Sequence, residues 1–277
     1  MTGRVLLVGG TGFLGRYVTS RLCQRNPVVL VRPTRQRSAV PPGIEPRVGD
    51  LDRPLPLDGI SELVYCASMG FGHVPPLIPQ LEAAGVRRAI FLSTTAIFTS
   101  LPAPSRAVRL AAEQAVQSSS LDWTILRPTM IYGAAGDRNI SRLLRALRRW
   151  PVFPVCGNGL WQPVYVEDLA DAVVAALDTP QAIGRAYNLP GAFPVRLSGL
   201  IRTAAEAIGR RVMLVRVPVA AAVLAARISR IVTPEQVRRL AEDKAFDYTA
   251  AAQDLNFHPR SFAEGVRLEA KLLGLVP

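Results

Sequence analysis

The sequence predicts an α/β fold, a doubly wound parallel sheet with a small, mostly helical C-terminal lobe. Short apolar runs rich in β-branched residues alternate with segments of helical period over the first two-thirds of the 277 residues. Such strand–helix repeats need right-handed crossovers, which produce a parallel sheet with helices on both faces. The runs VLLVGG and AIFLS lack polar alternation, as expected for strands that are buried on both faces.

The predicted elements follow one another regularly as far as Tyr132. Beyond it the pattern fades into an amphipathic segment, 141–150, and a Pro/Gly-rich piece, 151–163. One more strand–helix unit, 163–177, precedes a largely helical C-terminal third. The expected strands are 4–10, 27–32, 62–68, 87–95 and 122–128, and the expected helices are 13–25, 75–84 and 105–119.

Composition excludes several protein classes. The 49% hydrophobic content gives ample material for a buried core, so disorder is not expected. The cysteines, Cys23, Cys66 and Cys156, show no metal-binding spacing, and we expect buried apolar residues in a reducing compartment, with no metal. The first residues lack the pattern of a secretory signal, which favours a cytoplasmic protein.

The most apolar region, 212–232, is interrupted by Arg216, Pro218, Arg227 and Arg230. It never reaches the roughly 18 uncharged residues that a membrane span needs, so we expect a helix packed on the core. A helix lying on a membrane surface is the alternative, and membrane docking is not expected.

The formal net charge of +12 could indicate nucleic acid or an anionic ligand. Only Lys244 and Lys271 are lysine, and the other 31 of the 33 basic residues are arginines spread over most of the chain. No helix-turn-helix, stacking platform or zinc-finger pattern accompanies them, so no nucleic-acid partner is predicted. Anionic phosphate ligands fit better.

A glycine-rich turn follows the first strand and opens the first helix. Gly9, Gly12 and Gly15 have G-x-x-G-x-x-G spacing in the run VLLVGGTGFLG. In this context glycines let the backbone approach a pyrophosphate, which amide N–H groups and the start of the helix then hold. The sequence therefore predicts a Rossmann dinucleotide site, with a purely structural turn as the alternative. The expected loop contacts also include Thr11, Phe13 and Leu14.

The end of the second strand bears on which dinucleotide binds. An acidic residue there takes the ribose hydroxyls in many NAD sites, whereas arginine suits a 2′-phosphate. This strand ends VLVRPTRQR, which offers Arg32, Arg35 and Arg37 and no carboxylate. NADP(H) is therefore favoured over NAD(H), with a solvated basic loop as the alternative. A further strand, the third in chain order, is expected just before Gly49. Asp50 and Leu51 follow it, which places Asp50 to face the adenine.

These residues belong to a longer series of motifs: VGGTGFLG, GDL, FLSTTAIF, ILRPTMIYG, QPVYVEDLADA, AYNL and FDYTAAAQDLNFHPRSFAEGVR. Over nearly its full length the chain resembles the extended and atypical short-chain dehydrogenase/reductases, the NAD-dependent epimerase/dehydratase family. The resemblance implies a Rossmann domain over 1–132 and 162–190, and a substrate-binding lobe over 133–161 and 191–277.

Members of this family normally carry a Tyr-x-x-x-Lys pair that exchanges a proton and orients the ribose. Alignment on Glu113 puts Ser105 at the tyrosine position and Arg109 at the lysine position. None of the six tyrosines has a lysine four residues later. Arg109 stays protonated at neutral pH, so we expect it to hold the cofactor, and Ser105 needs a partner base to act.

A hydroxyl cluster remains at the end of the 87–95 strand, where parallel sheets bind ligands. Thr94 matches the family's catalytic serine or threonine, which hydrogen-bonds the substrate oxygen, and Ser93 and Thr95 flank it. Hydroxyls that satisfy the local backbone are the alternative. The resemblance also implies cofactor contacts at Ala67, Pro128, Thr129 and Ile131, and substrate contacts at Gln162 and Val164.

Other polar residues are weaker candidates, for which structural roles are favoured. His73, Tyr132 and Asp137 could carry protons, and Arg138, Arg142 and Arg145 could hold a diphosphate but read better as a solvated face. We expect His258 to be structural and Asp168 to start a helix.

The function favoured by these residues is a reductase or epimerase that acts on a nucleotide sugar or similar anionic metabolite. Thr94 would polarise the substrate oxygen, and no proton donor is identified. One alternative is a sensor, regulator or assembly factor that binds NADP(H) without turnover. Another is an apo scaffold whose basic surface docks on a membrane or an acidic partner. An oligomer is compatible with the apolar segment 217–226.

Overall fold

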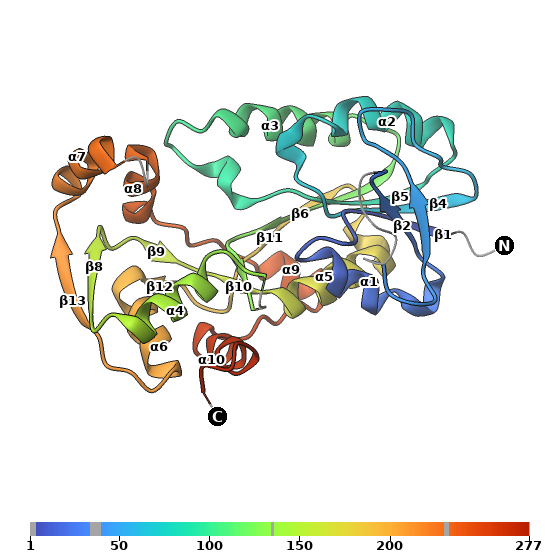
Figure 1. The fold of residues 1–277 in the computed structure, drawn as a ribbon. Helices are drawn as coiled ribbons and strands as arrows, with labels where there is room; N and C mark the ends of the chain where they lie inside the picture. The colour runs from blue at the N-terminus through green and yellow to red at the C-terminus, as the bar shows by residue number, and fades with distance from the viewer. Residues whose placement is uncertain (1–3, 34–39, 134–135, 230–232, 277) are drawn as a thin grey trace.

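Seven parallel strands form a central sheet (Figure 1). The computed structural model describes residues 4–33, 40–133, 136–229 and 233–276. The strands of this sheet are β1 (Arg4–Val8), β2 (Val28–Val31), β3 (Glu45–Val48), β4 (Ile60–Tyr65), β5 (Arg88–Leu92), β6 (Asp122–Pro128) and β11 (Arg185–Leu189).

The sheet order is β11-β6-β5-β4-β1-β2-β3, and every neighbouring pair is parallel. From β1 the chain moves outward to β3, then crosses back to β4 and moves outward in the other direction. This reversal leaves a crevice at the carboxyl ends of β1 and β4, where doubly wound sheets bind ligands. The predicted fold class is confirmed.

Helices cover both faces of the sheet (Figure 1). α2 (Val74–Ala83) and α3 (Pro104–Gln117) pack over one face, and α1 (Gly15–Arg21), α5 (Val166–Asp178) and α9 (Thr249–Leu255) pack over the other. Alternate residues of β1 supply the two cores: Leu6 points to the first and Leu7 to the second. Burial on both faces explains why the apolar runs show no alternation.

A further core forms the small lobe, to the left in Figure 1. Its helices α4 (Ile140–Arg149), α6 (Leu197–Ala207) and α10 (Phe262–Leu272) enclose Tyr132 and Tyr165. The predicted boundaries of the two lobes stay a prediction. The lobe also contains three two-stranded sheets: β7 (Ile131–Tyr132) with β10 (Val164–Tyr165), β9 (Leu160–Trp161) with β12 (Val195–Arg196), and β8 (Val152–Cys156) with β13 (Met213–Val217).

Helices α7 (Val219–Ser229) and α8 (Pro234–Ala241) pack mainly on each other. Their contact buries Ala226 and Val237 beside Cys156, in a cluster separate from the larger cores. The expectation of a helix packed on the main core is therefore corrected, because among the described residues α7 packs on this small cluster and leaves Leu224 60% exposed. No helix in the described part of the chain is long and apolar enough to cross a membrane.

The cysteine expectation is wrong for Cys23. Cys156 is buried and Cys66 half-buried, but Cys23 is exposed. The reason is that α1 ends at Arg21, four residues before the predicted helix end. Cys23 therefore lies in a short 3-10 helix, η1 (Cys23–Arg25), whose residues do not continue the buried stripe of α1.

A carboxyl group is fully buried in the small lobe. Glu269 of α10 is 0% exposed, and neither of its oxygens has a hydrogen-bond partner among the described residues. The Tyr132 hydroxyl is also buried without a partner. Burial, and after it the nearby charge of Asp137, raises the pKa of Glu269 to about 8.

Stability should therefore fall as the pH rises from 4.5, the ordinary pKa of a glutamate, towards about 8. In this window the folded protein keeps the Glu269 proton that the unfolded chain has lost, so the unfolded state binds fewer protons. We expect Glu269→Gln to flatten this dependence and to melt several degrees above the wild type near pH 8. Thermal unfolding of both proteins as a function of pH measures the slope and the difference in melting temperature. Glu206→Gln, at an exposed carboxyl of α6, is the control, and an unaltered slope in Glu269→Gln would contradict the assignment.

Candidate cofactor and substrate sites

The glycine turn between β1 and α1 closes tightly. The Gly9 carbonyl accepts a hydrogen bond from the Gly12 amide at 2.9 Å. A β-carbon at Gly12 would lie 3.0 Å from the Gly9 oxygen, and one at Gly15 would lie 2.0 Å from it. Gly15 therefore cannot carry a side chain unless the turn opens.

Gly9 also joins this turn to the end of β4. Its φ is +80°, and a β-carbon there would lie 2.9 Å from the Ala67 amide nitrogen. Within the described residues, the amides of Thr11, Phe13 and Leu14 donate to no backbone carbonyl. A narrow glycine cradle with unused amides suits a pyrophosphate, so the residues present fit a dinucleotide.

The residues predicted to face the adenosine lie at neighbouring strand ends. Arg32 follows β2 directly and is exposed, while Asp50 and Leu51 follow β3, the partner of β2. Asp50 Oδ1 accepts a hydrogen bond from the Asp52 amide at 3.3 Å, and Leu51 packs against the core beneath. Arg35 and Arg37, also predicted here, lie outside the described residues.

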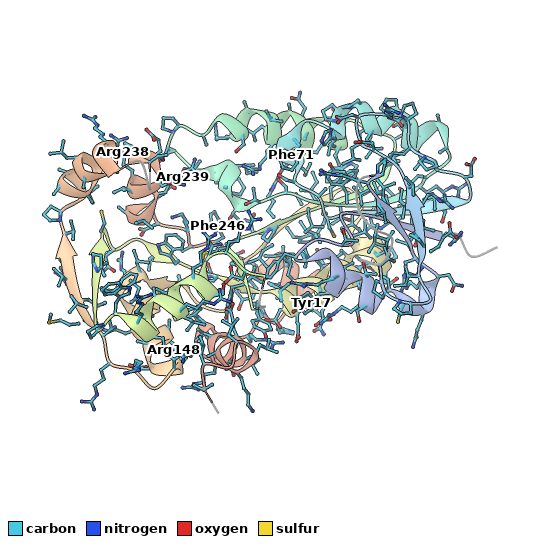
Figure 2. The ribbon with its side chains drawn as sticks, in the orientation of Figure 1. Tyr17, Phe71, Arg148, Arg238, Arg239 and Phe246 are labelled. Atoms are coloured by element: carbon cyan, nitrogen blue, oxygen red, sulfur yellow. The ribbon has the colours of Figure 1, made fainter. Side chains whose placement is uncertain are left out.

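A cavity of about 470 Å³ lies at the carboxyl ends of β5 and β6. The hydroxyls that follow β5 form one wall, and α8 with residues 242–246 forms the opposite wall. Figure 2 shows Arg239 and Phe246 between α8 and the sheet. A larger hollow, about 640 Å³, lies beside Arg4 and Glu62 at the amino ends of the strands. Because parallel sheets bind ligands at their carboxyl ends, we assign the site to the cavity beside β5.

The three hydroxyls after β5 are placed differently. Thr94 lines the cavity while its oxygen accepts a hydrogen bond from the Ala96 amide at 3.2 Å. Thr95, which begins the 3-10 helix η4 (Thr95–Phe98), also lines it and donates to the Pro128 carbonyl at 3.4 Å. Ser93 is buried outside the lining, and its hydroxyl has no partner among the described residues.

Ser105 and Arg109 contact each other on α3. Arg109 Nη1 donates to Ser105 Oγ at 2.6 Å. The guanidinium lies against Gly70 in η3 (Met69–Phe71), the turn that follows β4, where a β-carbon would be 3.3 Å from Arg109 Cζ. Burial, and then the positive charge of Arg239, lowers the pKa of Arg109. Neither Ser105 nor Arg109 lines the cavity.

The segment after β6 ties the cavity walls together. Thr129 Oγ1 donates to the Gln162 carbonyl at 2.5 Å. The Gln162 side chain donates to the Gly191 carbonyl at 2.8 Å and accepts from the Phe246 amide at 2.9 Å. Thr129 and Gln162 line the cavity, whereas Ile131 and Val164 pair in β7 and β10 and do not.

Lys244 is a site residue that the sequence analysis missed. It lines the cavity with Thr94, and its Nζ lies 3.8 Å from the centre of the Trp161 ring. The ammonium also donates to the Arg239 carbonyl. Burial is the main cause that lowers its pKa to about 8, far below that of an exposed lysine. The signal in the sequence was its rarity, since only one other lysine occurs.

Arg239 adds a second cation to the same wall. Its Nε is buried and has no hydrogen-bond partner in the described part of the chain. The carboxylates beside it are already engaged: Glu242 accepts from the Thr99 hydroxyl at 2.7 Å, and Asp243 accepts from the Leu160 amide at 2.7 Å. The unpaired donor of Arg239 is therefore available to an anionic ligand.

The remaining predicted residues lie elsewhere. His73 precedes α2 with its Nδ1 3.3 Å from Asp52, and His258 is exposed beside Asn256. Asp137 accepts from the Ser141 amide at 2.7 Å at the start of α4. The three arginines Arg138, Arg142 and Arg145 are exposed on or next to α4. Asp168 lies in the first turn of α5, as predicted, and is paired with Arg260.

Comparison with known proteins identifies the family. The profile described as NAD(P)H-binding matches residues 9–180, from the glycine turn to the turn after α5. The chain belongs to this NAD(P)H-binding family. Ceramide reductase from Caulobacter vibrioides (strain NA1000 / CB15N) is 31% identical to this family member over 244 residues, which are 78% of this chain and 74% of the reductase.

One further relative and one solved structure of the same fold are informative. Mitochondrial NADH dehydrogenase (ubiquinone) 1 alpha subcomplex subunit 9 from Arabidopsis thaliana is 29% identical over 66% of this chain, which spans about half, 52%, of that relative. UDP-glucuronic acid 4-epimerase from Bacillus cereus, in complex with NAD, matches 98% of both chains with a TM-score of 0.76 and 15% identity. The expected resemblance is confirmed at the level of an NAD(P)H-binding family and of a fold shared with this epimerase.

Two glycine substitutions test the constraint at the dinucleotide turn. Gly9 and Gly43 have φ of +80° and +83°, but a β-carbon at Gly43 would meet nothing within 4 Å. Gly43→Ala should lower the free energy of unfolding by roughly 1 kcal/mol, because alanine is strained in a left-handed backbone conformation. Gly9→Ala adds a clash with Ala67, so we expect at least roughly twice that loss of stability and a loss of NADPH binding. Urea unfolding and calorimetry measure both, and equal losses would contradict the clash.

Proposed function

We propose that the protein is an NADP(H)-dependent reductase or epimerase that acts on an anionic metabolite such as a nucleotide sugar. One observation carries the proposal. The Thr94 hydroxyl and a lysine with a pKa of about 8, Lys244, line the same cavity at the carboxyl end of β5. A hydroxyl that polarises a substrate oxygen and a group that can exchange a proton near neutral pH are the parts that this chemistry needs.

The cofactor would lie across the crevice at the carboxyl ends of β1 and β4. The turn at Gly9 to Gly15 would hold its pyrophosphate, Arg109 its ribose, and Pro128 with Thr129 its nicotinamide end. When bound, the nicotinamide would supply or accept the hydride. Arg32, at the end of β2, would pair with the 2′-phosphate of NADP(H).

The substrate would occupy the cavity between Thr94 and α8. The unpaired Nε of Arg239 and the ammonium of Lys244 favour an anionic group there. A volume of about 470 Å³ is within the range of small-molecule sites. Relatives of this fold include epimerases for UDP-glucuronic acid and UDP-glucose, which supports a nucleotide sugar.

Lys244 is our candidate for the proton carrier that the Ser105–Arg109 pair lacks. Arg109 remains charged at neutral pH, and its guanidinium is the one hydrogen-bond partner of the Ser105 hydroxyl within the described residues. Lys244 can instead hold a proton below about pH 8 and release it above. Thr94 would then hydrogen-bond the reacting oxygen while Lys244 gives or takes the proton.

The cofactor preference is tested with Arg32→Asp. A carboxylate at this position should repel the 2′-phosphate, so we expect NADPH binding to weaken by roughly tenfold or more. NADH binding should change little, because NADH has no phosphate at that position. Calorimetric titration of both nucleotides measures the change, and Arg53→Asp, another exposed arginine without an ion pair in the described residues, is the control. Similar NADPH affinity in wild type and Arg32→Asp would refute the assignment.

The proton carrier is tested with both lysines. We expect Lys244→Met to lower turnover by roughly 100-fold with UDP-glucose or UDP-glucuronic acid, whichever is converted, and to leave NADPH binding intact. Lys271→Met, on the exposed end of α10, is the matched control. In the direction in which Lys244 donates, the rate should fall above about pH 8, because the amine is then neutral. If Lys244→Arg kept full turnover and the same pH profile, Lys244 would contribute only a positive charge and would not be the proton carrier.

A second candidate is an NADP(H)-binding sensor or assembly factor without turnover. The hydrogen bond between Ser105 and Arg109 favours it, since both groups are fixed in a pair that cannot move a proton. One relative is a subunit of NADH dehydrogenase and another is named Photosystem II assembly factor Ycf39. Tight NADPH binding without conversion of any nucleotide sugar would favour this candidate.

A further inference from the structure

The positive charge of the chain is concentrated in two segments of the small lobe. Residues 138–166 and 196–240 contain fourteen arginines and only two acidic residues, Glu206 and Glu235, which gives a formal charge of +12. The rest of the chain has nineteen basic and nineteen acidic residues and is neutral. Even when the bordering acidic residues Asp137, Glu242 and Asp243 are counted with this end, most of the net charge belongs to it, although arginines occur throughout the chain.

These two segments lie together at the end of the molecule opposite the N-terminus (Figure 1). They form α4, α6, α7, α8 and the β8–β13 sheet. Within the described residues, ten exposed arginines of this end make no ion pair, so their charge is not compensated locally. These are Arg138, Arg142, Arg145, Arg148, Arg149, Arg202, Arg210, Arg211, Arg216 and Arg227.

An apolar strip crosses the same end. In the β8–β13 sheet Met213 pairs with Val152, and Val215 pairs with Pro154. Met213 is 61% exposed, and Val152 and Val215 are each 43% exposed, while the alternate residues Phe153 and Leu214 turn inward onto the small-lobe core. The outer side of this sheet is therefore an unpartnered apolar surface among arginines.

Trp150 extends the strip at one end. Trp150 has an extended backbone, precedes Val152 by two residues and is 58% exposed. Arg149 Cζ lies 5.9 Å from the centre of the Trp150 ring. Tryptophan and arginine side chains are suited to the boundary between lipid headgroups and acyl chains, where one end is apolar and the other is wet. We define the docking face as Trp150, Val152, Pro154, Met213 and Val215 with the surrounding arginines.

We propose that this docking face binds an anionic phospholipid surface. A second copy of the chain fits poorly, since a symmetric contact would place uncompensated arginines against one another. A purely electrostatic partner would leave the apolar strip without a role. Anionic headgroups match the arginines and the acyl boundary matches the strip, so one occupant accounts for both. This revises the expectation, drawn from the sequence, that the protein does not dock on membranes.

Vesicle sedimentation of the full chain tests the proposal. We expect binding to phosphatidylcholine vesicles that contain phosphatidylglycerol, little binding to phosphatidylcholine alone, and weaker binding as salt increases. The double variant Arg149→Glu/Arg211→Glu, at the arginine over the Trp150 ring and at the one just before β13, should lose roughly tenfold or more in affinity for the anionic vesicles. The control Arg53→Glu/Arg87→Glu makes the same change in net charge with exposed arginines of the central domain and should bind nearly as the wild type does.

The apolar strip is tested separately. Met213→Ser should weaken binding to the anionic vesicles, whereas Ile183→Ser, at an exposed apolar residue of the central domain, should not. NADPH calorimetry confirms that each variant is folded. Equal losses in the docking and control variants, or no vesicle binding by the wild type, would overturn the proposal. So would concentration-dependent dimers, or binding of an oligonucleotide with the same arginine dependence while Met213→Ser has no effect on vesicles.

Discussion

The close approach of Gly9 to Gly15 is the constraint on which the cofactor half of the molecule depends. The start of α1 lies so near the Gly9 carbonyl that a β-carbon at Gly15 would be 2.0 Å from that oxygen. Gly9 itself abuts Ala67, so β1, α1 and β4 meet at one point. Because three elements converge there without side chains between them, the crevice above stays narrow enough for backbone amides to reach a phosphate.

The central sheet was predictable because its signals are local. Buried strands, the glycine spacing and helical periods each lie within a few residues, and together they give β1 to β6 in order. The small lobe was not, because its strands are short and pair across long separations, as Val195 does with Trp161. The same holds for the cavity. Thr94 could be found from its motif, whereas Arg239 and Lys244 reach it from α8 and beyond, where no periodicity announces a site. The exposed position of Cys23 depended on where α1 ends, which is also a tertiary property.

The molecule handles charge in opposite ways in its interior and on its surface. Inside, burial shifts Glu269 and Lys244 towards their neutral forms, since a desolvated charge is costly without a partner. The buried carboxylate of Glu113, in contrast, is paired with Arg127. At the docking face, the arginines are exposed to water and make no ion pair within the described part of the chain. The unpaired positive charge thus lies at the surface, where the arginines need not lose their hydration. These arginines are therefore available to a negatively charged partner.

The path of the chain between its cores has a consequence for how the protein folds and can be divided. After the small-lobe strands begin, the chain returns to the sheet with β11, which pairs along β6, and later with α9, which packs beside α5. It then ends in α10, back in the small-lobe core. The core between the sheet and α1, α5 and α9 is not completed by a contiguous stretch, and neither is the small-lobe core. Closure of the sheet must therefore await residues synthesised long after β6. A chain cut between the lobes would expose apolar faces on both fragments, and the two halves are expected to be cooperative partners in unfolding.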